Sequence, residues 1–192
     1  LALGGVVTRG ARDRAGAHVG QRVAHRRRVD LAAAGGVERD GLANASVSAM
    51  VQDAAGFIWI GTQGGLHRWD GHSFTLYENE PFDSSSLPHN LIQTLFMDED
   101  GITLWVGTYG GLARFDTKTE RFQSWVHDPD DPRSLVNDVV VSIARDASGR
   151  LWVGTLSGLD RMDGDGFRHY SPASGAPGAI SVGVIRALFK DS

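Results

Sequence analysis

The sequence contains no cysteine, which excludes a disulfide framework, a cysteine-type zinc site and thiol catalysis. No stretch approaches the roughly 20 apolar residues that span a bilayer, so we expect no membrane contact from this chain. Proline is also scarce, with 6 Pro against 25 Gly among 192 residues. Frequent glycine with few prolines indicates many tight turns, and hence many short strands.

Positive charge is sparse over most of the chain. Residues 1–40 hold eight Arg against four acidic residues, whereas residues 41–192 hold 11 basic against 19 acidic residues. This acidic part would repel a polyanion, and it has no stripe of Lys and Arg with interleaved aromatics. We therefore expect no nucleic-acid partner.

Aromatic residues and regular periodicity are absent from residues 1–40, which are rich in Arg, Ala and Gly. Three consecutive arginines, 26–28, could bind a membrane surface or a polyanion. A solvated tail is the simpler interpretation. We expect residues 1–40 to form a poorly ordered head and residues 41–192 to form the folded domain.

Motifs of catalysis and metal binding are missing as well. The chain has no GxSxG, P-loop or HExxH, and no acid pair outside a repeated pattern. Asp128, Asp130 and Asp131 lack the spacing of a calcium loop, and two prolines stiffen their segment. We expect no catalytic residue, metal site or cofactor.

What the sequence does contain is one pattern that occurs three times and begins a fourth time. The copies start 45, 48 and 45 residues apart, at Leu42, Leu87, Leu135 and Ile180. An Asp follows eleven residues later in each copy, namely Asp53, Asp98, Asp146 and Asp191. Tandem self-similarity of this kind is the signature of a repeat fold.

Each copy predicts four short strands. The first is a β-prone run, at 47–52, 92–97, 140–145 and 185–190, and an Asp-to-Gly turn follows it. The second strand carries Trp-x-Gly-Thr at 58–62, 104–108 and 151–155, a Gly-Leu step opens the third, and two aromatics three residues apart mark the fourth. The repeated turn and Trp positions are expected to be structural: Asp53, Gly56, Trp59, Asp98, Gly101, Trp105, Asp146, Gly149 and Trp152.

Four strands in every 45 to 48 residues are typical of a propeller rather than a solenoid or sandwich. We predict an all-β fold, a β-propeller fragment with three four-stranded antiparallel blades and the first strand of a fourth. The blades span about 42–77, 87–125 and 135–170, with the partial one in 180–192. The repeated Trp is predicted to fill the space between blades. Closure takes about four to eight blades, so the remaining blades of the same propeller are expected partners.

If the first strand is innermost, the loops between second and third strands share one face with the connectors at 78–86, 126–134 and 171–179. Recognition usually occurs on such loops. Tyr109 with His89 and Asn90 could hold a sugar by stacking and hydrogen bonds. The candidate ligand-binding residues are Asn44, Gln63, His89, Asn90, Tyr109, Asn137, Asp138 and Leu156. The alternative is that the Asn and Asp residues cap strand ends and shape turns.

The combination of "LxxNxV", "DxxGxxW", "WVGTxxGLxRxD" and a connector such as "HDPDDPRSL" resembles the two-component regulator propeller family over residues 41–192. The resemblance implies tandem seven-bladed propellers that form the exported sensor of a membrane receptor. A transmembrane helix and a histidine kinase or diguanylate cyclase output would follow. It further implies a periplasmic location at the inner membrane, a small-molecule or glycan ligand and a homodimer of the full receptor.

We therefore expect a binding module of a bacterial signalling receptor that does not transform its ligand. One alternative is a propeller enzyme, a lyase or glycan-active protein, which a non-repeating cluster of Glu, His or Tyr at the channel mouth would favour. The other is a protein-interaction scaffold, which a flat apolar mouth would favour. Enzymatic activity of the full-length protein would reside in its output domain.

Overall fold

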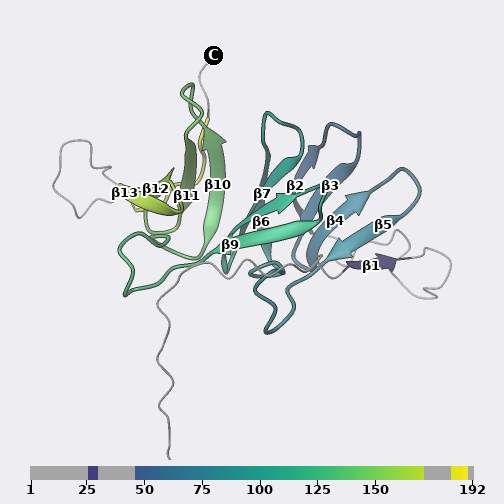
Figure 1. Cartoon of the computed structure of the whole chain (residues 1–192), viewed down its shortest axis with the longest axis horizontal. Coiled ribbons are helices and arrows are strands. Elements are labelled where there is room, and N and C mark those ends of the chain that lie inside the picture. Colours follow the sequence, from purple (N-terminus) through teal and green to yellow (C-terminus); the bar gives the residue numbers. More distant parts are fainter. Residues whose placement is uncertain (1–25, 30–45, 171–182, 190–192) are drawn as a thin grey trace, which may run out of the picture.

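The computed structural model describes residues 26–29, 46–170 and 183–189. These residues form antiparallel strands joined by turns and loops, and the three sheets stand side by side in chain order (Figure 1). Within the described ranges there is no helix long and apolar enough to cross a membrane. The predicted all-β fold with four-stranded blades is confirmed.

The first sheet holds the four strands of the first repeat and one strand from the head. Its order is β1-β5-β4-β3-β2. The strands are β1 (Arg26–Val29), β2 (Val47–Gln52), β3 (Ile58–Thr62), β4 (Gly65–Trp69) and β5 (Phe74–Tyr77).

The second and third sheets hold one repeat each, in the orders β6-β7-β8-β9 and β10-β11-β12-β13. The second consists of β6 (Ile92–Met97), β7 (Thr103–Thr108), β8 (Gly111–Asp116) and β9 (Arg121–Trp125). The third consists of β10 (Val140–Arg145), β11 (Leu151–Thr155), β12 (Leu159–Asp163) and β13 (Gly166–Tyr170). Each sheet is one blade, and the first strand of each repeat lies at its inner edge.

Strand β1 differs from the expectation of a poorly ordered head over residues 1–40. It pairs antiparallel with β5, with Arg26 opposite Tyr77 and Val29 opposite Phe74. The outer strand of a blade presents unpaired backbone N–H and C=O groups, and a strand can add there through backbone hydrogen bonds alone. Such pairing needs no alternating side-chain pattern, so periodicity could not reveal it. The rest of the head lies outside the described residues.

The turn between the first two strands is built as the sequence predicts. In the first blade the carboxylate of Asp53 accepts hydrogen bonds from the amides of Ala55 and Phe57, at 2.9 and 3.0 Å. The glycines at the end of this turn have positive φ, 90° for Gly56, 67° for Gly101 and 79° for Gly149. Only glycine adopts such angles without steric cost, so both repeated turn positions are structural.

The repeated Trp fills the space between blades, as predicted. Trp59 is fully buried, and its ring centroid lies 5.2 Å from that of Phe115 in the second blade. Trp105 takes the equivalent place between the second and third blades, in a core that includes Val140 and Ile143. The blades are therefore held together by two aromatic-rich cores, whereas Trp152 lies on the free side of the third blade.

The aromatic pair of each fourth strand points to opposite faces, as alternation requires. Phe122 lies 6.2 Å from Tyr77 of the first blade, and Trp125 lies 6.4 Å from Phe167 of the third, measured between ring centroids. The second blade thus uses its first aromatic against the preceding blade and its second against the following one.

The next blade approaches the glycine of the Trp-x-Gly-Thr segment closely. A Cβ built on Gly61 would lie 2.5 Å from Cγ2 of Ile92, and one on Gly107 would lie 2.7 Å from Cγ1 of Val140. On Gly154 the same atom would lie 2.7 Å from Cγ2 of Ile185. The first residues of β6 and β10, and Ile185 after the third blade, therefore occupy the space that a side chain would need.

The predicted first strand of a fourth blade, 185–190, is not a strand in residues 185–189, and Lys190 lies outside the described residues. Ile185 nevertheless sits against Gly154 and donates its amide to the carbonyl of Thr155 at 3.0 Å. A first strand forms its ladder with the second strand of its own blade, which the sequence as given does not contain. The segment therefore has the position of a strand without the pairing.

Candidate ligand-binding face

The two described connectors share one hydrogen-bond network. In connector 78–86 the amide of Asn79 donates to Oδ1 of Asn90 at 2.6 Å, and in connector 126–134 the amide of His127 donates to Oδ1 of Asp138 at 2.6 Å. Asn79 Nδ2 also donates to the carbonyl of Leu87 at 2.6 Å. His127 Nδ1 lies 2.7 Å from the equivalent carbonyl of Leu135.

A serine closes each connector on itself. Ser86 Oγ accepts from the amide of Glu80 at 2.9 Å, and Ser134 Oγ accepts from the amide of Asp128 at the same distance. Because the same contacts recur residue for residue, each connector is a built turn of defined shape. The connectors therefore present their exposed side chains from a fixed backbone.

The polar residues proposed from the sequence as ligand contacts have turn-forming partners. Asn90 and Asp138 hold the connectors, as described above, and Oδ1 of Asn137 accepts from the amide of Val139 at 2.9 Å. Nδ1 of His89 accepts from the amide of Leu91 at 3.0 Å. This bond is equivalent to that of Asn137, with a ring nitrogen as the acceptor in place of an amide oxygen. These contacts favour the alternative that such residues cap strand ends and shape turns. Asn44 and connector 171–179 lie outside the described residues.

Three candidates remain exposed, and each follows the repeated Thr: Gln63, Tyr109 and Leu156. The loop that carries Tyr109 is tight, because Oγ1 of Thr108 donates to the carbonyl of Gly111 at 2.9 Å. The amide of Tyr109 donates to the carbonyl of Leu91 at 3.1 Å, which sets this loop beside the end of the connector. The loops and connectors therefore share one face, as the strand order requires.

Tyr109 and His89 form the pair that could contact a ligand on this face. The Tyr109 side chain is 46% exposed, and its ring centroid lies 6.5 Å from that of His89 with the ring planes tilted by 40°. A half-exposed phenol can offer an apolar ring face together with a hydroxyl. This pair can therefore stack on a flat or cyclic ligand while it donates or accepts a hydrogen bond.

The acidic residues of connector 126–134 serve its turns. Oδ1 of Asp128 accepts from the amide of Asp130 at 2.9 Å, and Oδ1 of Asp131 accepts from the amide of Arg133 at 2.8 Å. In the part of the chain that the structure describes, no three His, Asp or Glu side chains gather as a metal ion would require.

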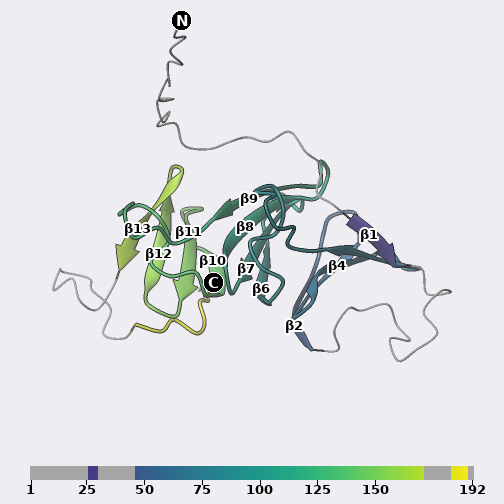
Figure 2. The same cartoon turned by 90° about the horizontal axis from the view of Figure 1, so that it is seen from below.

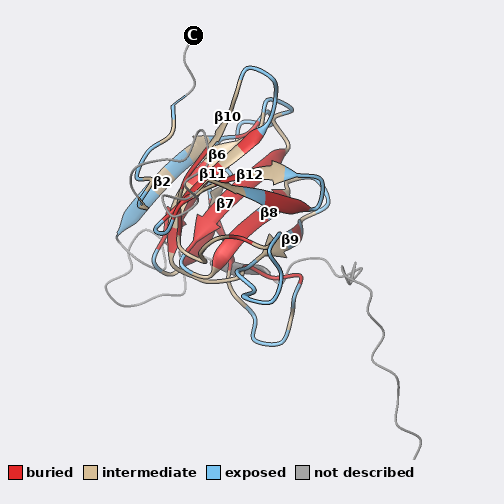
Figure 3. Cartoon of the chain, turned by 90° about the vertical axis from the view of Figure 1, so that its left-hand side faces the viewer, coloured by how far each residue is buried: buried red, intermediate tan, exposed pale blue. Residues whose placement is uncertain are grey.

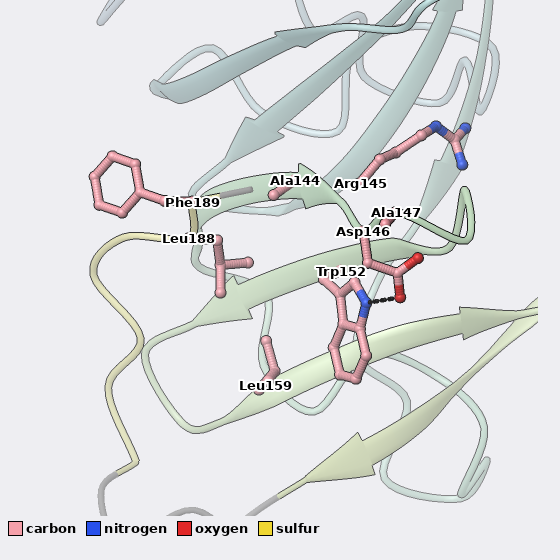
Figure 4. A pocket seen from close by; sticks show the side chains of 8 residues that line it. All are labelled: Ala144, Arg145, Asp146, Ala147, Trp152, Leu159, Leu188 and Phe189. Atoms are coloured by element: carbon pink, nitrogen blue, oxygen red, sulfur yellow. Dashed lines mark hydrogen bonds between the residues drawn. The ribbon is translucent and has the colours of Figure 1, made fainter. Parts of the chain in front are cut away.

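A cavity of about 450 Å³ lies away from this face, on the free side of the third blade. Trp152, Leu159, Leu188 and Phe189 contribute its apolar lining (Figure 4). Trp152 is the counterpart of Trp59 and Trp105, which the following blade buries. The cavity therefore lies where a following blade would pack. None of the predicted ligand-binding residues that the structure describes lines it.

One repeated interaction escaped the sequence analysis, although both partners were recognised as structural. The indole Nε1 of each repeated Trp donates to Oδ2 of the repeated Asp, at 2.9 Å for Trp59 and Asp53 and 3.2 Å for Trp105 and Asp98. Trp152 and Asp146 make the same bond at 2.9 Å (Figure 4). The recurring Asp-to-Trp spacing, six residues in the first and third blades and seven in the second, was the available signal.

An ion pair adds to this bond between the second and third blades. The guanidinium of Arg145 contacts both carboxylate oxygens of Asp98, with Nε 2.7 Å from Oδ1. Burial alone would raise the pKa of Asp98, but hydrogen bonds from Arg145 and Trp105 outweigh it and lower this pKa. One carboxylate thus connects its own Trp to the first strand of the next blade.

Comparison with known proteins agrees with this architecture. The family model described as "Two component regulator propeller" matches residues 41–64, 86–110 and 134–157, one segment in each blade. A stretch of 48 residues, 25% of this chain and 4% of its relative, is 48% identical to histidine kinase P4 of Formosa agariphila.

Solved structures share the fold. The extracellular domain of a hybrid two-component system from B. thetaiotaomicron is 26% identical with a TM-score of 0.66, over 81% of this chain and 22% of that one. The extracellular domain of a one-component system from the same organism is 24% identical with a TM-score of 0.65, over 80% of this chain and 20% of that one. This chain thus spans about a fifth of each domain. Each of the three blades thus contains a repeat of the two-component regulator propeller type, in the fold that the solved extracellular domains share.

Proposed function

We propose that this chain is part of the extracytoplasmic sensor of a bacterial signalling receptor. The observation that carries the proposal is the propeller repeat in all three blades. The chain is also 26% identical to the extracellular domain of a hybrid two-component system. The matched stretch of histidine kinase P4 supports a histidine kinase as the output domain. A diguanylate cyclase is the alternative output domain, and the full receptor is proposed to be a homodimer.

Further blades of the same propeller are proposed to cover the inner strand of the first blade. Val47 and Met50 on β2 are 45% and 63% exposed, whereas their counterparts Ile92 and Leu95 on β6 are 0% and 8% exposed. In Figure 3, β2 is mostly pale blue, whereas β7 and β8 of the middle blade are mostly red. A surface with the same residue types as a blade core is suited to the same partner, which is another blade.

The ligand is proposed to bind on the connector face through Tyr109 and His89. The exposed phenol ring on a rigid loop supports a small molecule or glycan, because aromatic faces stack on the apolar faces of sugars. The test is binding of the intact receptor ectodomain to a glycan array, followed by calorimetry on each hit. Tyr109→Ala should weaken binding about tenfold or more, the loss of roughly 1.4 kcal/mol, and Lys118→Ala in the exposed turn between β8 and β9 is the control.

The receptor assignment has its own test. The gene should encode a transmembrane helix and a kinase or cyclase domain after the propeller, and its product should fractionate with the inner membrane. A propeller followed by neither element would contradict the receptor proposal, whether or not a glycan binds.

A further inference from the structure

The third blade contains a buried acid with a histidine partner. Asp160 on β12 is fully buried, and it lies directly opposite His169 on β13. His169 Nδ1 is 2.7 Å from Oδ1 of Asp160, and the imidazole is partly exposed. None of the roles assigned above uses this pair.

Both members of the pair also hold the chain that enters the third blade. Nε2 of His169 lies 2.8 Å from the carbonyl oxygen of Pro132, inside connector 126–134. Oδ2 of Asp160 accepts a hydrogen bond from the amide of Val136 at 2.9 Å. The pair therefore fastens the end of the connector at two points, four residues apart.

These contacts require one proton more than a neutral imidazole and a carboxylate carry together. The carbonyl of Pro132 can only accept, so Nε2 must carry a proton to bond with it. Nδ1 and Oδ1 then also need a proton between them, either on the imidazole or on the carboxyl group. Once that shared proton is lost, a neutral imidazole has a single N–H for two acceptors, and one of the two contacts becomes repulsive.

The other blades place different side chains at these positions. His67 and Leu76 occupy them in the first blade, and Ala113 and Ser124 occupy them in the second. Connector 78–86, which otherwise has the same hydrogen-bond network, therefore leads into a blade whose corresponding pair cannot share a proton. The chain thus contains its own comparison segment.

The other charged and titratable groups near this pair have interactions of their own. His127 of the connector is the other titratable group that acts on Asp160, and its positive form favours the carboxylate. Arg133 of the connector donates to the carbonyl of Asp163 at 2.8 Å. Arg161 on β12 and Arg168 on β13 lie over the rings of Trp152 and Tyr170.

We propose that Asp160 and His169 form a proton-dependent latch that holds connector 126–134 against the third blade at acidic pH and releases it as the pH rises. Burial raises the pKa of Asp160, although the hydrogen bond from His169 opposes this. A raised pKa means that the folded chain keeps this proton more readily than the unfolded chain does, so the net shift favours the closed latch at low pH. The latch itself rests on the geometry. Because connector 126–134 lies on the proposed ligand-binding face, ligand binding should also vary with pH, and this consequence rests on the proposed function.

Hydrogen–deuterium exchange of the intact protein at several pH values tests the latch, with rates corrected for intrinsic exchange. The segment 130–137 should lose protection about tenfold between pH 6 and pH 9, as expected for one charge-assisted hydrogen bond. The segment 82–89 should change little over the same range. An equal change in both connectors would overturn the proposal.

Two variants separate a proton-dependent latch from a merely structural contact. In Asp160→Asn the amide can donate to Nδ1 of a neutral His169, whose Nε2–H can then bond to Pro132 without an extra proton. This variant should keep segment 130–137 protected at both pH values. His169→Leu should leave that segment less protected at both.

His127→Asn is the matched control, because Asn79 makes the same contact in the first connector. It should retain the pH response of the wild type. If His169→Leu keeps the wild-type response, or His127→Asn removes it, the latch is not made by this pair. Ligand binding that does not vary with pH would contradict only its role in recognition.

Discussion

At the scale of single residues, the repeated aspartate does more than shape a turn. In the second blade, Asp98 binds the indole of Trp105 and the guanidinium of Arg145 at once. Asp53 holds Trp59 in the same way but precedes a blade that contributes Met97 at the position of Arg145. The three blades thus repeat one Asp–Trp bond and differ in what the next blade adds to it.

Asp98→Asn should destabilise the chain more than Asp53→Asn does. Both variants weaken the bond to the Trp indole, but only Asp98→Asn leaves a partly buried arginine without its carboxylate. We expect a difference of about 1–2 kcal/mol in the free energy of unfolding, measured by chemical denaturation at neutral pH. Equal losses would mean that the ion pair contributes nothing to stability.

His67 should make stability depend on pH in the acidic range. Its side chain is buried on β4, and burial lowers its pKa from 6.5 to about 4. Below pH 6.5 the unfolded chain therefore binds a proton that the folded chain does not, and stability falls until about pH 4.

The variant for this test is His67→Leu, compared with the wild type by denaturation at pH 7, 5.5 and 4. The wild type should lose up to about 3 kcal/mol relative to the variant across this range. Parallel pH profiles for the two proteins would show that His67 is not buried in its neutral form.

At the scale of elements, contact between blades depends on the glycine in the second strand. A Cβ on Gly107 would lie 2.6 Å from Cγ2 of Thr94 and 3.0 Å from the carbonyl oxygen of Val140. One atom is in the same blade and the other belongs to the backbone of the next blade, so neither strand can shift freely. The position must therefore lack a side chain.

Gly107→Ala should destabilise the packing of the second blade on the third by about 1–3 kcal/mol, the usual cost of overpacking. Gly183→Ala is the control, since its nearest neighbour would be the carbonyl oxygen of Ser157 at 3.7 Å. Thermal unfolding followed by tryptophan fluorescence should report the difference, because Trp105 lies in this core. A neutral Gly107→Ala would show that the blades are packed less closely than described.

The elements were largely predictable, because each blade repeats the same local signals. The bounds of β2, β6 and β10 agree with the predicted runs at 47–52, 92–97 and 140–145. Strand β1 was not predictable, since its pairing uses backbone groups only. The final segment lacked a strand because a ladder needs a partner, and local sequence carries no information about whether a partner is present.

At the scale of the whole molecule, three blades form an open fan with two uncovered sides (Figure 2). One side carries Met50 on β2, and the other carries Trp152 beside the 450 Å³ cavity. Exposed apolar surface of this kind promotes association. The array of three blades should therefore be more prone to self-association than its net charge suggests.

This prediction can be checked by size-exclusion chromatography with light scattering on the chain of 192 residues. The chain should run as oligomers or aggregates at micromolar concentration, and Met50→Lys should shift it toward the monomer. Tyr109→Ser removes a comparably exposed apolar side chain from the connector face and should leave the distribution unchanged. A stable monomeric wild type would contradict the proposal that blades cover these sides.

The sequence by itself determined the strands, the turns and the blade repeat, because these depend on residues close together in the chain and recurring at one spacing. Tertiary structure decided how the same residue types are used. It made Asn90 and Asp138 hydrogen-bond acceptors for the connectors and Asn137 an acceptor for the turn that follows. It also left Tyr109 exposed beside His89 and placed His169 between Asp160 and the carbonyl of Pro132. Such roles depend on which groups meet across strands and connectors, and that proximity exists only after the blades have formed.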